Sequence, residues 1–284
     1  MRRHALVSTL AGFASLAAIA AASPALAGSV SFVSSKGVDN GNCGLSTAPC
    51  RTFAYALTQT NASGEIKVLD PGFYNPVTIN KSVTITGVPG ASIAMVAAST
   101  AITINAGVNG IVNLRGIDIN GQGIGAGGIK VQTAKAVNIV DCVVRQVTGI
   151  GIFVTTSSNV MATISNTISS NNGVSGIDIS ASSGGSVKAS IDNSTTNYNG
   201  SFGVNIGAGV TAMVTDSNSN DNGAAGFRAL GATTIMQLGR NVATRNGNGI
   251  ENVNSTATVQ SFGTNMVRSN SLNSLGTIVQ ITHL

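Results

Sequence analysis

Residues 160–179 read VMATISNTISSNNGVSGIDI, and residues 187–206 repeat that pattern as VKASIDNSTTNYNGSFGVNI. Each copy begins with apolar residues at every second position, which is typical of a half-buried strand. An Asn-Gly step follows in each copy, and Asn and Gly both tolerate the left-handed backbone of a tight turn. A Gly and an apolar residue then open a second alternating segment. The two copies therefore predict short strands separated by turns.

The same pattern recurs along much of the chain. The turn glycines are Gly149, Gly173, Gly200, Gly223 and Gly247. The segments between them are too short to contain the crossover helix of an ordinary parallel sheet. Such repeats instead stack as a solenoid, in which each strand pairs with its counterpart in the next coil. We therefore predict an all-β solenoid of about nine coils over residues 65–284, roughly 43 Å long at one strand spacing per coil.

The composition agrees with a packed β protein. Only 9% of the 284 residues are charged, whereas 43% are hydrophobic, and the chain has 35 glycines and no tryptophan. Intrinsic disorder requires few apolar residues and high net charge, so the chain is expected to fold. The many glycines and β-branched residues exclude a continuous coiled coil. Ser, Thr and Asn must supply most of the polar surface.

Residues 1–27 have the features of an export signal. A short basic start precedes a segment rich in small apolar residues, which ends in Ala25-Leu26-Ala27. This ending is typical of a signal-peptide cleavage site. The alternative is a transmembrane anchor, because the apolar segment is about long enough to span a bilayer. We interpret residues 1–27 as a cleaved signal peptide, and expect a secreted or periplasmic protein with no stable membrane anchor.

Charge and histidine content limit the function further. Residues 1–27 contain two arginines and no acidic residue, so the net charge falls from +5 to +3 after their removal. This charge is too small to indicate a nucleic-acid partner. Only His283 remains among the histidines. Histidine-based metal sites and Ser-His-Asp catalysis are therefore not expected.

The three cysteines predict one disulfide. Cys43 and Cys50 lie close together in a loop rich in Gly and Asn. Export places them in an oxidising compartment, where we expect them to pair. Cys142 is left over. We interpret it as a structural cysteine, with a reactive thiol as the alternative.

The two ends of the solenoid differ in sequence. Residues 28–64 are predicted to hold a first strand, the disulfide loop and a short capping helix over residues 51–57, with Phe53, Ala54 and Leu57 on its inner face. Such a cap is needed because open β edges invite aggregation. Residues 277–284 are predicted to form an edge strand. That edge is either tolerated, capped by a loop or covered by a partner, and our hypothesis is homo-oligomerisation.

The N-terminal block carries a resemblance to a known family. Its segments are VSSKGVD at residues 33–39, PCRTF at 49–53, GEIKVLDPGFY at 64–74 and INKSVTITG at 79–87. This block resembles the opening of secreted right-handed parallel β-helix repeat proteins of the pectate-lyase-like superfamily. The resemblance implies a right-handed parallel β-helix with a capping helix. It does not imply one activity, because this superfamily includes lyases, hydrolases, esterases, epimerases and adhesins.

Aligning the repeats stacks one set of outward side chains into a column after the Gly-apolar step. Its members are Lys130, Phe153, Asp178, Asn205, Arg228 and Glu251. Charged and aromatic residues on one exposed face make it the candidate ligand site. We take Phe153 and Asn205 as candidate ligand-binding residues. The alternative is a solvated face with an Arg228–Glu251 ion pair, which would contribute about 0–1 kcal/mol.

The candidate catalytic residues of this column are Lys130, Asp178, Arg228 and Glu251. If the protein is an enzyme, Lys130 or Arg228 would act as base, and Asp178 or Glu251 would be its charge partner. Direct contact between Asp178 and Arg228 is not expected, because they lie two coils apart.

Two further columns lie at and after a turn, and we predict that they are structural ladders. One contains Asp141, Asn166, Asn193, Asp216 and Arg240, and the other contains Arg145, Ser170, Asn197, Asn220 and Thr244. Stacked Asn side chains can hydrogen-bond along a solenoid as they do in cross-β stacks.

The carboxylates do not form a recognisable catalytic or metal-binding set. A calcium-dependent lyase needs clustered oxygen ligands, but Asp141 and Asp216 lie three coils apart, roughly 14 Å. Glycoside hydrolysis needs two carboxyl groups about 5–9.5 Å apart, and Asp216 and Asp221 are the only acidic pair close in sequence late in the chain. We therefore expect no metal site and no cofactor, with calcium as the exception if the protein is a lyase.

These features favour a secreted β-helix protein that binds or scaffolds extracellular polysaccharide without catalysis. The expected partner is an acidic polysaccharide, because late arginines could attract an anionic polymer in a salt-sensitive way. Phe153 is the outward aromatic residue suited to stacking on a sugar, and Tyr198 at a turn could assist. The alternative is a polysaccharide-active enzyme, most simply a lyase acting on uronate glycans.

Overall fold

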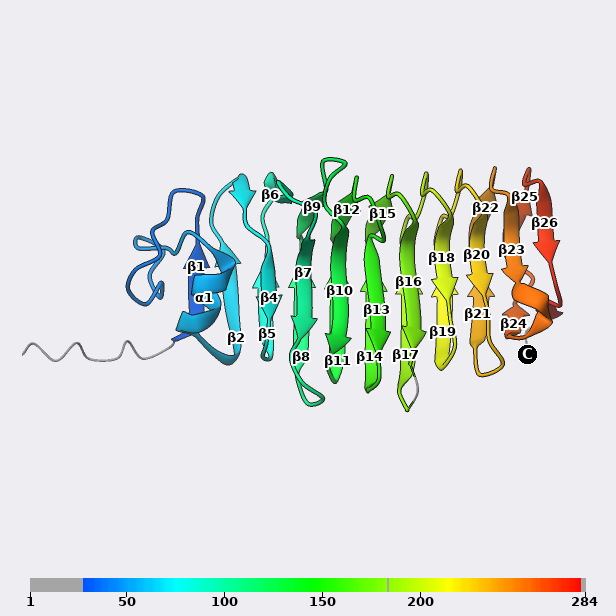
Figure 1. The fold of residues 1–284 in the computed structure, drawn as a ribbon, viewed down its shortest axis with the longest axis horizontal. Coiled ribbons are helices and arrows are strands. Elements are labelled where there is room, and N and C mark those ends of the chain that lie inside the picture. Colours follow the sequence, from blue (N-terminus) through cyan, green and yellow to red (C-terminus); the bar gives the residue numbers. More distant parts are fainter. Residues whose placement is uncertain (1–27, 183, 282–284) are drawn as a thin grey trace, which may run out of the picture.

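The computed structural model describes residues 28–182 and 184–281. These residues form a parallel β-solenoid whose coils stack along the long axis of the molecule (Figure 1). The predicted fold class is confirmed. The predicted signal peptide, residues 1–27, lies outside the described residues.

Each full coil contributes strands to three faces, which we call sheets A, B and C in chain order. Sheet A consists of β1 (Gly28–Val33), β2 (Thr60–Val68), β5 (Val83–Thr86), β8 (Ile111–Arg115), β11 (Ala136–Val140), β14 (Asn159–Ser165), β17 (Ser186–Asp192), β19 (Val210–Thr215), β21 (Ile235–Gly239), β24 (Thr258–Ser261) and β27 (Val279–Gln280).

Sheet C has nine strands and is the longest face after sheet A. It consists of β4 (Val77–Ile79), β7 (Thr100–Asn105), β10 (Gly127–Thr133), β13 (Ile152–Thr156), β16 (Ser175–Ala181), β18 (Phe202–Ile206), β20 (Ala225–Ala229), β23 (Asn248–Asn252) and β26 (Leu272–Leu275). The short 3-10 helix η1 (Val253–Ser255) follows β23.

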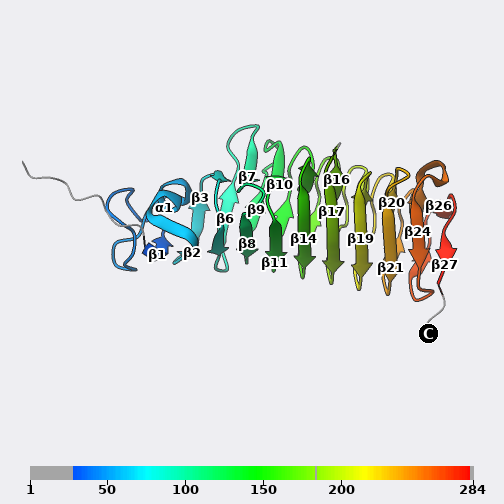
Figure 2. The ribbon, with the colours of Figure 1, turned by 90° about the horizontal axis from the view of Figure 1, so that it is seen from below.

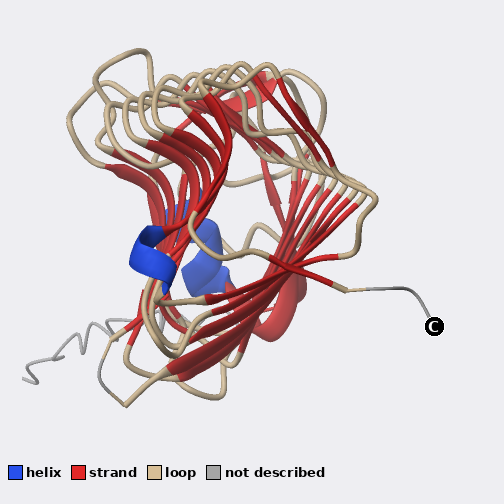
Figure 3. Cartoon of the chain, turned by 90° about the vertical axis from the view of Figure 1, so that its right-hand side faces the viewer, coloured by secondary structure: helices blue, strands red, loops and turns tan. Residues whose placement is uncertain are grey.

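Sheet B is the narrowest face. It consists of β3 (Gly72–Tyr74), β6 (Ala91–Ala94), β9 (Asp118–Asn120), β12 (Val143–Arg145) and β15 (Ile168–Ser170), with β22 (Val242–Thr244) and β25 (Met266–Arg268) further along. Isolated bridges at Thr195 and Asn218 connect the two groups of strands. The end view shows the three faces superposed coil upon coil (Figure 3).

The repeat in the sequence becomes the register of the strands. Val160 of β14 pairs with Val187 of β17, which pairs in turn with Val210 of β19, all in parallel. Side chains alternate along β14 and β17, with every second residue buried. Columns of like aliphatic residues therefore stack inside the solenoid: Val over Val, Ala over Ala, and Ile over Ile or Val. Each large aliphatic side chain buried in this way contributes about 1.5–3 kcal/mol.

The N-terminal end is closed by the helix α1 (Phe53–Gln59), two residues later than predicted. Thr52 caps the helix, because its hydroxyl accepts from the backbone N–H of Tyr55. Phe53, Ala56 and Leu57 are buried. The prediction that Ala54 faces inward is wrong, because residues i, i+3 and i+4 share a helix face and Ala56 occupies the middle position. In Figure 2 the helix lies at the end of the row of coils.

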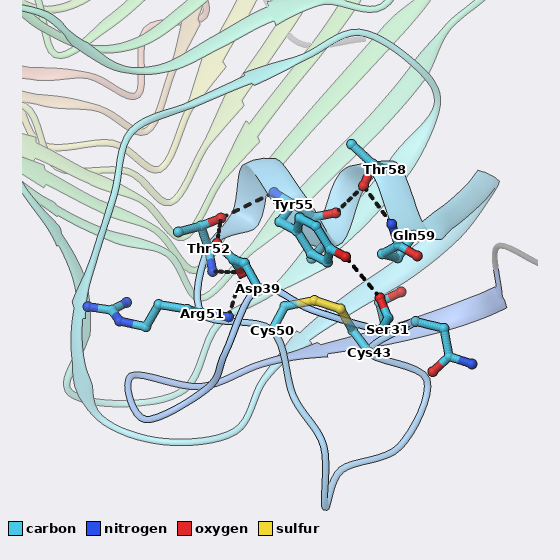
Figure 4. Close-up of a disulfide and its surroundings, with 12 residues drawn as sticks. Ser31, Asp39, Cys43, Cys50, Arg51, Thr52, Tyr55, Thr58 and Gln59 are labelled. Atoms are coloured by element: carbon cyan, nitrogen blue, oxygen red, sulfur yellow. Dashed lines mark hydrogen bonds between the residues drawn. A yellow bond between two sulfur atoms is a disulfide. The ribbon is translucent and has the colours of Figure 1, made fainter. Parts of the chain in front are cut away.

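The predicted disulfide between Cys43 and Cys50 is present, with their Cα atoms 5.3 Å apart. It closes the loop before α1, where the Tyr55 hydroxyl donates to the carbonyl of Gly41 (Figure 4). The third cysteine, Cys142, is free and buried. Burial raises the pKa of its thiol to about 11. The structural interpretation of Cys142 agrees with this environment.

The other end of the solenoid is less covered. Leu272, Leu275 and Val279 of the last strands are all more than two-fifths exposed. The strand predicted over residues 277–284 is present only as β27, and residues 282–284 lie outside the described residues. Homo-oligomerisation through this edge stays a prediction. In residues 28–182 and 184–281, no helix has the length and apolar character needed to cross a membrane.

Candidate functional site

The predicted outward column forms on sheet C with every member in register. Lys130 pairs with Phe153 and Phe153 with Asp178, so three successive coils carry these side chains. The column continues through Asn205 of β18 to Arg228 of β20 and Glu251 of β23. A glycine lies two residues before every member of the column, so the same point is marked in each repeat.

The last four members bind one another, and we call them the polar tetrad: Asp178, Asn205, Arg228 and Glu251. The Asn205 amide donates from Nδ2 to Asp178 Oδ2 at 2.9 Å, and its Oδ1 accepts from Arg228 Nη1 at 2.9 Å. Arg228 Nε lies 3.8 Å from Glu251 Oε2. Asp178 and Arg228 do not touch directly, as expected, because Asn205 lies between them.

The tetrad is more buried than a solvated face would be. Asn205 is only 8% exposed, and the side chains of Arg228 and Glu251 are 19% and 16% exposed. The guanidinium of Arg228 also lies over the ring of Phe202, 4.5 Å from its centre. The expected Arg228–Glu251 ion pair is present. Because it is partly buried, the small contribution to stability expected for an exposed ion pair does not apply to it. Its removal would leave a partly buried charge without a partner.

Burial also changes the acidity of Asp178. Loss of solvation raises its pKa above the usual range, although the Asn205 amide and the Arg228 charge act in the opposite direction. This carboxyl therefore holds its proton more tightly in the folded chain than in the unfolded chain.

The first two members of the column are arranged differently, and we call Lys130 and Phe153 the open pair. Within the described chain, the Lys130 ammonium forms no ion pair or hydrogen bond. Both side chains border a hollow of about 290 Å³. Its other walls are Thr100, Ala126, Gly127, Gly128, Ile129, Gly149, Ile150 and Val174. The open pair thus combines a free positive charge, an aromatic ring and a largely apolar depression.

Two acidic residues at the turns are held by arginines. Arg240 makes a two-pronged contact with Asp216, and Arg245 makes the same contact with Asp221. These contacts lower the pKa of both carboxyl groups. Asp216 and Asp221 are therefore each the ion-pair partner of an arginine. Among the described residues there is no group of three or more His, Cys, Asp or Glu placed to hold a metal ion.

The first predicted ladder runs along the turns between sheets A and B. Asn166 donates to Asp141 at 2.5 Å, and Asn193 donates to Asn166 at 3.2 Å. All five members have a left-handed backbone, with φ between 45° and 56°. Further along this ladder, the Asp216–Arg240 pair replaces the amide contacts.

In the second predicted ladder, side chains bind the backbone of the next coil. Asn197 Oδ1 accepts from the backbone N–H of Asn220, and Asn220 Oδ1 accepts from the backbone N–H of Thr244. Arg145 leaves the pattern and pairs with Asp118 at 3.0 Å.

A third ladder was missed by sequence reasoning. Asn172, Asn199, Asn222 and Asn246 stack inside the solenoid and are each at most 4% exposed. In every step, a side-chain oxygen accepts from both the backbone and side-chain N–H of the preceding asparagine. The signal was the Asn of each Asn-Gly step. It was interpreted as a turn residue only, whereas its side chain points inward and satisfies buried donors.

Comparison with known proteins gives a matching family, and the solved structures similar to this chain include a mannuronan epimerase module and a pectate lyase. Residues 127–281 match the family model of the right-handed β-helix region. The A-module of the mannuronan C-5 epimerase AlgE4 of Azotobacter vinelandii is 14% identical, covers 78% of this chain and 89% of its own, and has a TM-score of 0.44. Pectate lyase Pel9A is 17% identical, covers 89% of this chain and 77% of its own, and has a TM-score of 0.43.

No curated protein matches the chain significantly. The family match covers more than half of the chain, including all of the sheet C column. Its extent coincides with the coils from β10 onward. The chain therefore belongs to the right-handed β-helix region family.

Proposed function

We propose that the protein binds an acidic polysaccharide along the outer face of sheet C and does not cleave it. The open pair supplies the contact with the glycan, and the polar tetrad joins neighbouring coils. The observation that carries this proposal is the contrast between them. Among the described residues Lys130 has no partner, and it borders a hollow of about 290 Å³, whereas Arg228 already contacts Asn205, Glu251 and Phe202.

The chemistry of the open pair suits a uronate residue. The ammonium of Lys130 would attract the carboxylate of the sugar, and the ring of Phe153 would pack against its carbon-bound hydrogens. The two residues are register partners on adjacent strands, which lie about 4.8 Å apart. One sugar can therefore reach both. A shallow site of this kind, largely apolar with one charged group, is typical of ligand pockets.

The tetrad gives little support to a cleavage reaction. A general base must be unprotonated near the operating pH so that it can accept a proton. An arginine stays protonated, and Arg228 is in addition surrounded by partners. Asp178 and Glu251 lie three strand spacings apart, roughly 14 Å. This separation exceeds the range of about 5–9.5 Å used by paired carboxyl groups in glycosidases.

One observation favours the alternative, a lyase acting on uronate glycans. Lys130 carries an amine without a partner in the described chain, and an unprotonated lysine amine can remove a proton from a sugar ring. In this alternative Lys130 would be the base, and Phe153 would position the ring. Export to an oxidising compartment, for which the Cys43–Cys50 disulfide provides support, fits both functions.

The binding proposal is tested by calorimetry with polygalacturonate and with alginate. We expect wild-type protein to bind at least one of them, and Lys130→Ala and Phe153→Ala each to weaken binding roughly fivefold to tenfold. Lys188→Ala and Phe73→Ala are matched controls, because both side chains are exposed on other faces. These controls should bind like wild type.

Two results would contradict the binding proposal. One is equal loss of affinity in Lys188→Ala and Lys130→Ala, which would indicate attraction by net charge alone. The other is the absence of binding to both polyuronates while thermal unfolding shows that the protein is folded.

A further inference from the structure

A second row of exposed side chains lies at the turns between sheets B and C. We call Gln122, Gln146, Asn171 and Tyr198 the turn ridge. They occupy equivalent positions in four successive coils, and all have a left-handed backbone with φ between 53° and 58°. Asp221 and Arg245 continue the row in the next two coils.

The amides of the turn ridge are free of internal partners. Within the described residues, the side chains of Gln122, Gln146 and Asn171 make no hydrogen bond. This differs from the ladder at the turns between sheets A and B, where Asn166 and Asn193 bond to their neighbours in the same stacked geometry. A left-handed backbone costs a residue with a side chain about 1–2 kcal/mol. Internal bonds offset this cost in the A–B ladder but not in the ridge amides.

The ridge borders a shallow, open hollow of about 700 Å³. Gly173 and Gly200 form part of its floor, and both are required there because a Cβ atom would lie 2.1 Å from a carbonyl oxygen of the preceding coil. The floor is therefore bare backbone. The residues that line the hollow are all uncharged: Gln122, Gly123, Gln146, Val147, Thr148, Asn171, Asn172, Gly173, Tyr198 and Gly200.

Tyr198 lines this hollow as its aromatic residue. Its side chain is exposed, at 58% for the residue. The neighbouring Asp221 is held by two contacts of 2.7 Å from Arg245. Arg245 and the Tyr198 hydroxyl both lower the pKa of Asp221, so the phenol interacts with the carboxylate. Asp221 and Arg245 thus balance each other's charge beside the ring.

We propose that the turn ridge is a second glycan-binding site, and that it takes an uncharged polysaccharide. Free amides both donate and accept, as sugar hydroxyls require, and the exposed Tyr198 ring offers a face for stacking. The amides repeat at about one strand spacing, 4.8 Å, so several hydroxyls of one chain can be bound together. The absence of charge in the lining separates this ligand class from that proposed for the open pair.

The test is binding of the full protein to dextran, galactomannan and xyloglucan, measured by affinity electrophoresis and calorimetry. We expect wild-type protein to bind at least one of these neutral polymers. The affinity should persist in about 1 M NaCl, where charges are screened beyond about 3 Å. Tyr198→Ala and Gln146→Ala should each weaken binding roughly fivefold to tenfold.

Controls separate stacking from folding defects. Tyr198→Phe keeps the ring and should bind within about twofold of wild type. Asn193→Ala removes an exposed amide from the other turn ladder and should leave binding unchanged. Lys130→Ala should also bind neutral polymers normally, so failure of the polyuronate proposal would not affect this result. The proposal is overturned if wild-type protein binds none of the three polymers, or if Tyr198→Ala binds them as wild type does.

Discussion

Two neighbouring groups of side chains on sheet C share one column but differ in what they contact. The polar tetrad is closed, since Asn205 bonds to both Asp178 and Arg228. In the open pair, the Lys130 ammonium has no partner in the described part of the chain and lies beside a hollow of about 290 Å³. Stacking brings equivalent side chains close together in both groups. Whether they pair therefore depends on complementary donors and acceptors, and groups without them remain available to a ligand.

The turns show the same difference between side chains that pair with neighbouring coils and side chains that do not. Along the A–B turns, Asn166 donates to Asp141 and accepts from Asn193. Along the B–C turns, Gln146 and Asn171 occupy the same kind of left-handed position, but their side chains make no hydrogen bond within residues 28–182 and 184–281. Closed ladders should therefore affect stability when they are mutated, whereas open rows should affect binding.

The largest effect on stability is expected in the buried asparagine ladder. Asn222→Ala removes the oxygen that accepts from the backbone and side-chain N–H of Asn199. These buried donors would then lack a partner, at a cost of about 3 kcal/mol in the free energy of unfolding. Urea unfolding measures this change. The control Asn171→Gly keeps the left-handed turn and should change stability by less than about 0.5 kcal/mol. Equal effects in the two variants would contradict the distinction between closed and open positions.

Arg228→Ala is expected to have the next largest effect, because it opens the tetrad. Asn205 and Glu251 lose their partner in a partly buried position, so the free energy of unfolding should fall by about 2 kcal/mol. The affinity for polygalacturonate should stay within about twofold of wild type. Loss of glycan binding without loss of stability would show that the tetrad, not the open pair, contacts the ligand.

Salt should weaken the binding of an acidic polysaccharide at the open pair. Screening weakens exposed charge interactions, so raising the salt concentration should weaken binding of wild-type protein to polygalacturonate. Lys130→Ala has lost the attracting charge, and its affinity should depend less on salt. Calorimetry over a salt series measures both slopes. Parallel slopes would place the attracting charge elsewhere on the surface.

The smallest effect is expected from Asp178→Asn. Burial raises the folded pKa of Asp178, so the folded chain binds this proton more tightly than the unfolded chain does. The contribution of Asp178 to stability is therefore present at pH values below its unfolded pKa and is lost as the pH rises through the folded pKa. Asp178→Asn should thus equal or slightly exceed wild type in stability at neutral pH, by less than about 1 kcal/mol, and lose this advantage in acid.

Asp216→Asn provides a comparison of opposite sign. Its pKa is lowered by the hydrogen bonds from Arg240, so its contribution is present above the unfolded pKa and disappears as the pH falls. Thermal unfolding of both variants between acid and neutral pH checks the two directions. If the stability of both variants relative to wild type changed in the same direction with pH, the burial of Asp178 would be contradicted.

The sequence predicted the solenoid because its period is explicit. Glycines mark each coil, and the strand alternation puts Lys130, Phe153 and Asp178 into one column, as the register confirms. The disulfide and the capping helix also followed from local patterns. Ala54 rather than Ala56 was predicted to face inward, because the sequence pattern of a seven-residue helix is too short to specify its inner face.

The contacts within each column could not be predicted from spacing alone. Asn205 was expected to face a ligand, yet both ends of its amide are used by its neighbours. The turn ridge was missed apart from Tyr198, because Gln146 lacks the preference for a left-handed backbone that Asn and Gly have. Pairing between coils depends on side-chain conformation, which period and polarity do not specify.

The most direct test of the central proposal follows the fate of a bound acidic polysaccharide. Polygalacturonate and alginate are incubated with enough protein to bind them, with and without calcium, while ultraviolet absorbance reports the unsaturated products of a lyase. Binding without chemical change predicts a flat trace and an unchanged polymer length. A rising trace that disappears in Lys130→Ala or Arg228→Ala, with the fold intact, would contradict the proposal and identify the protein as a lyase.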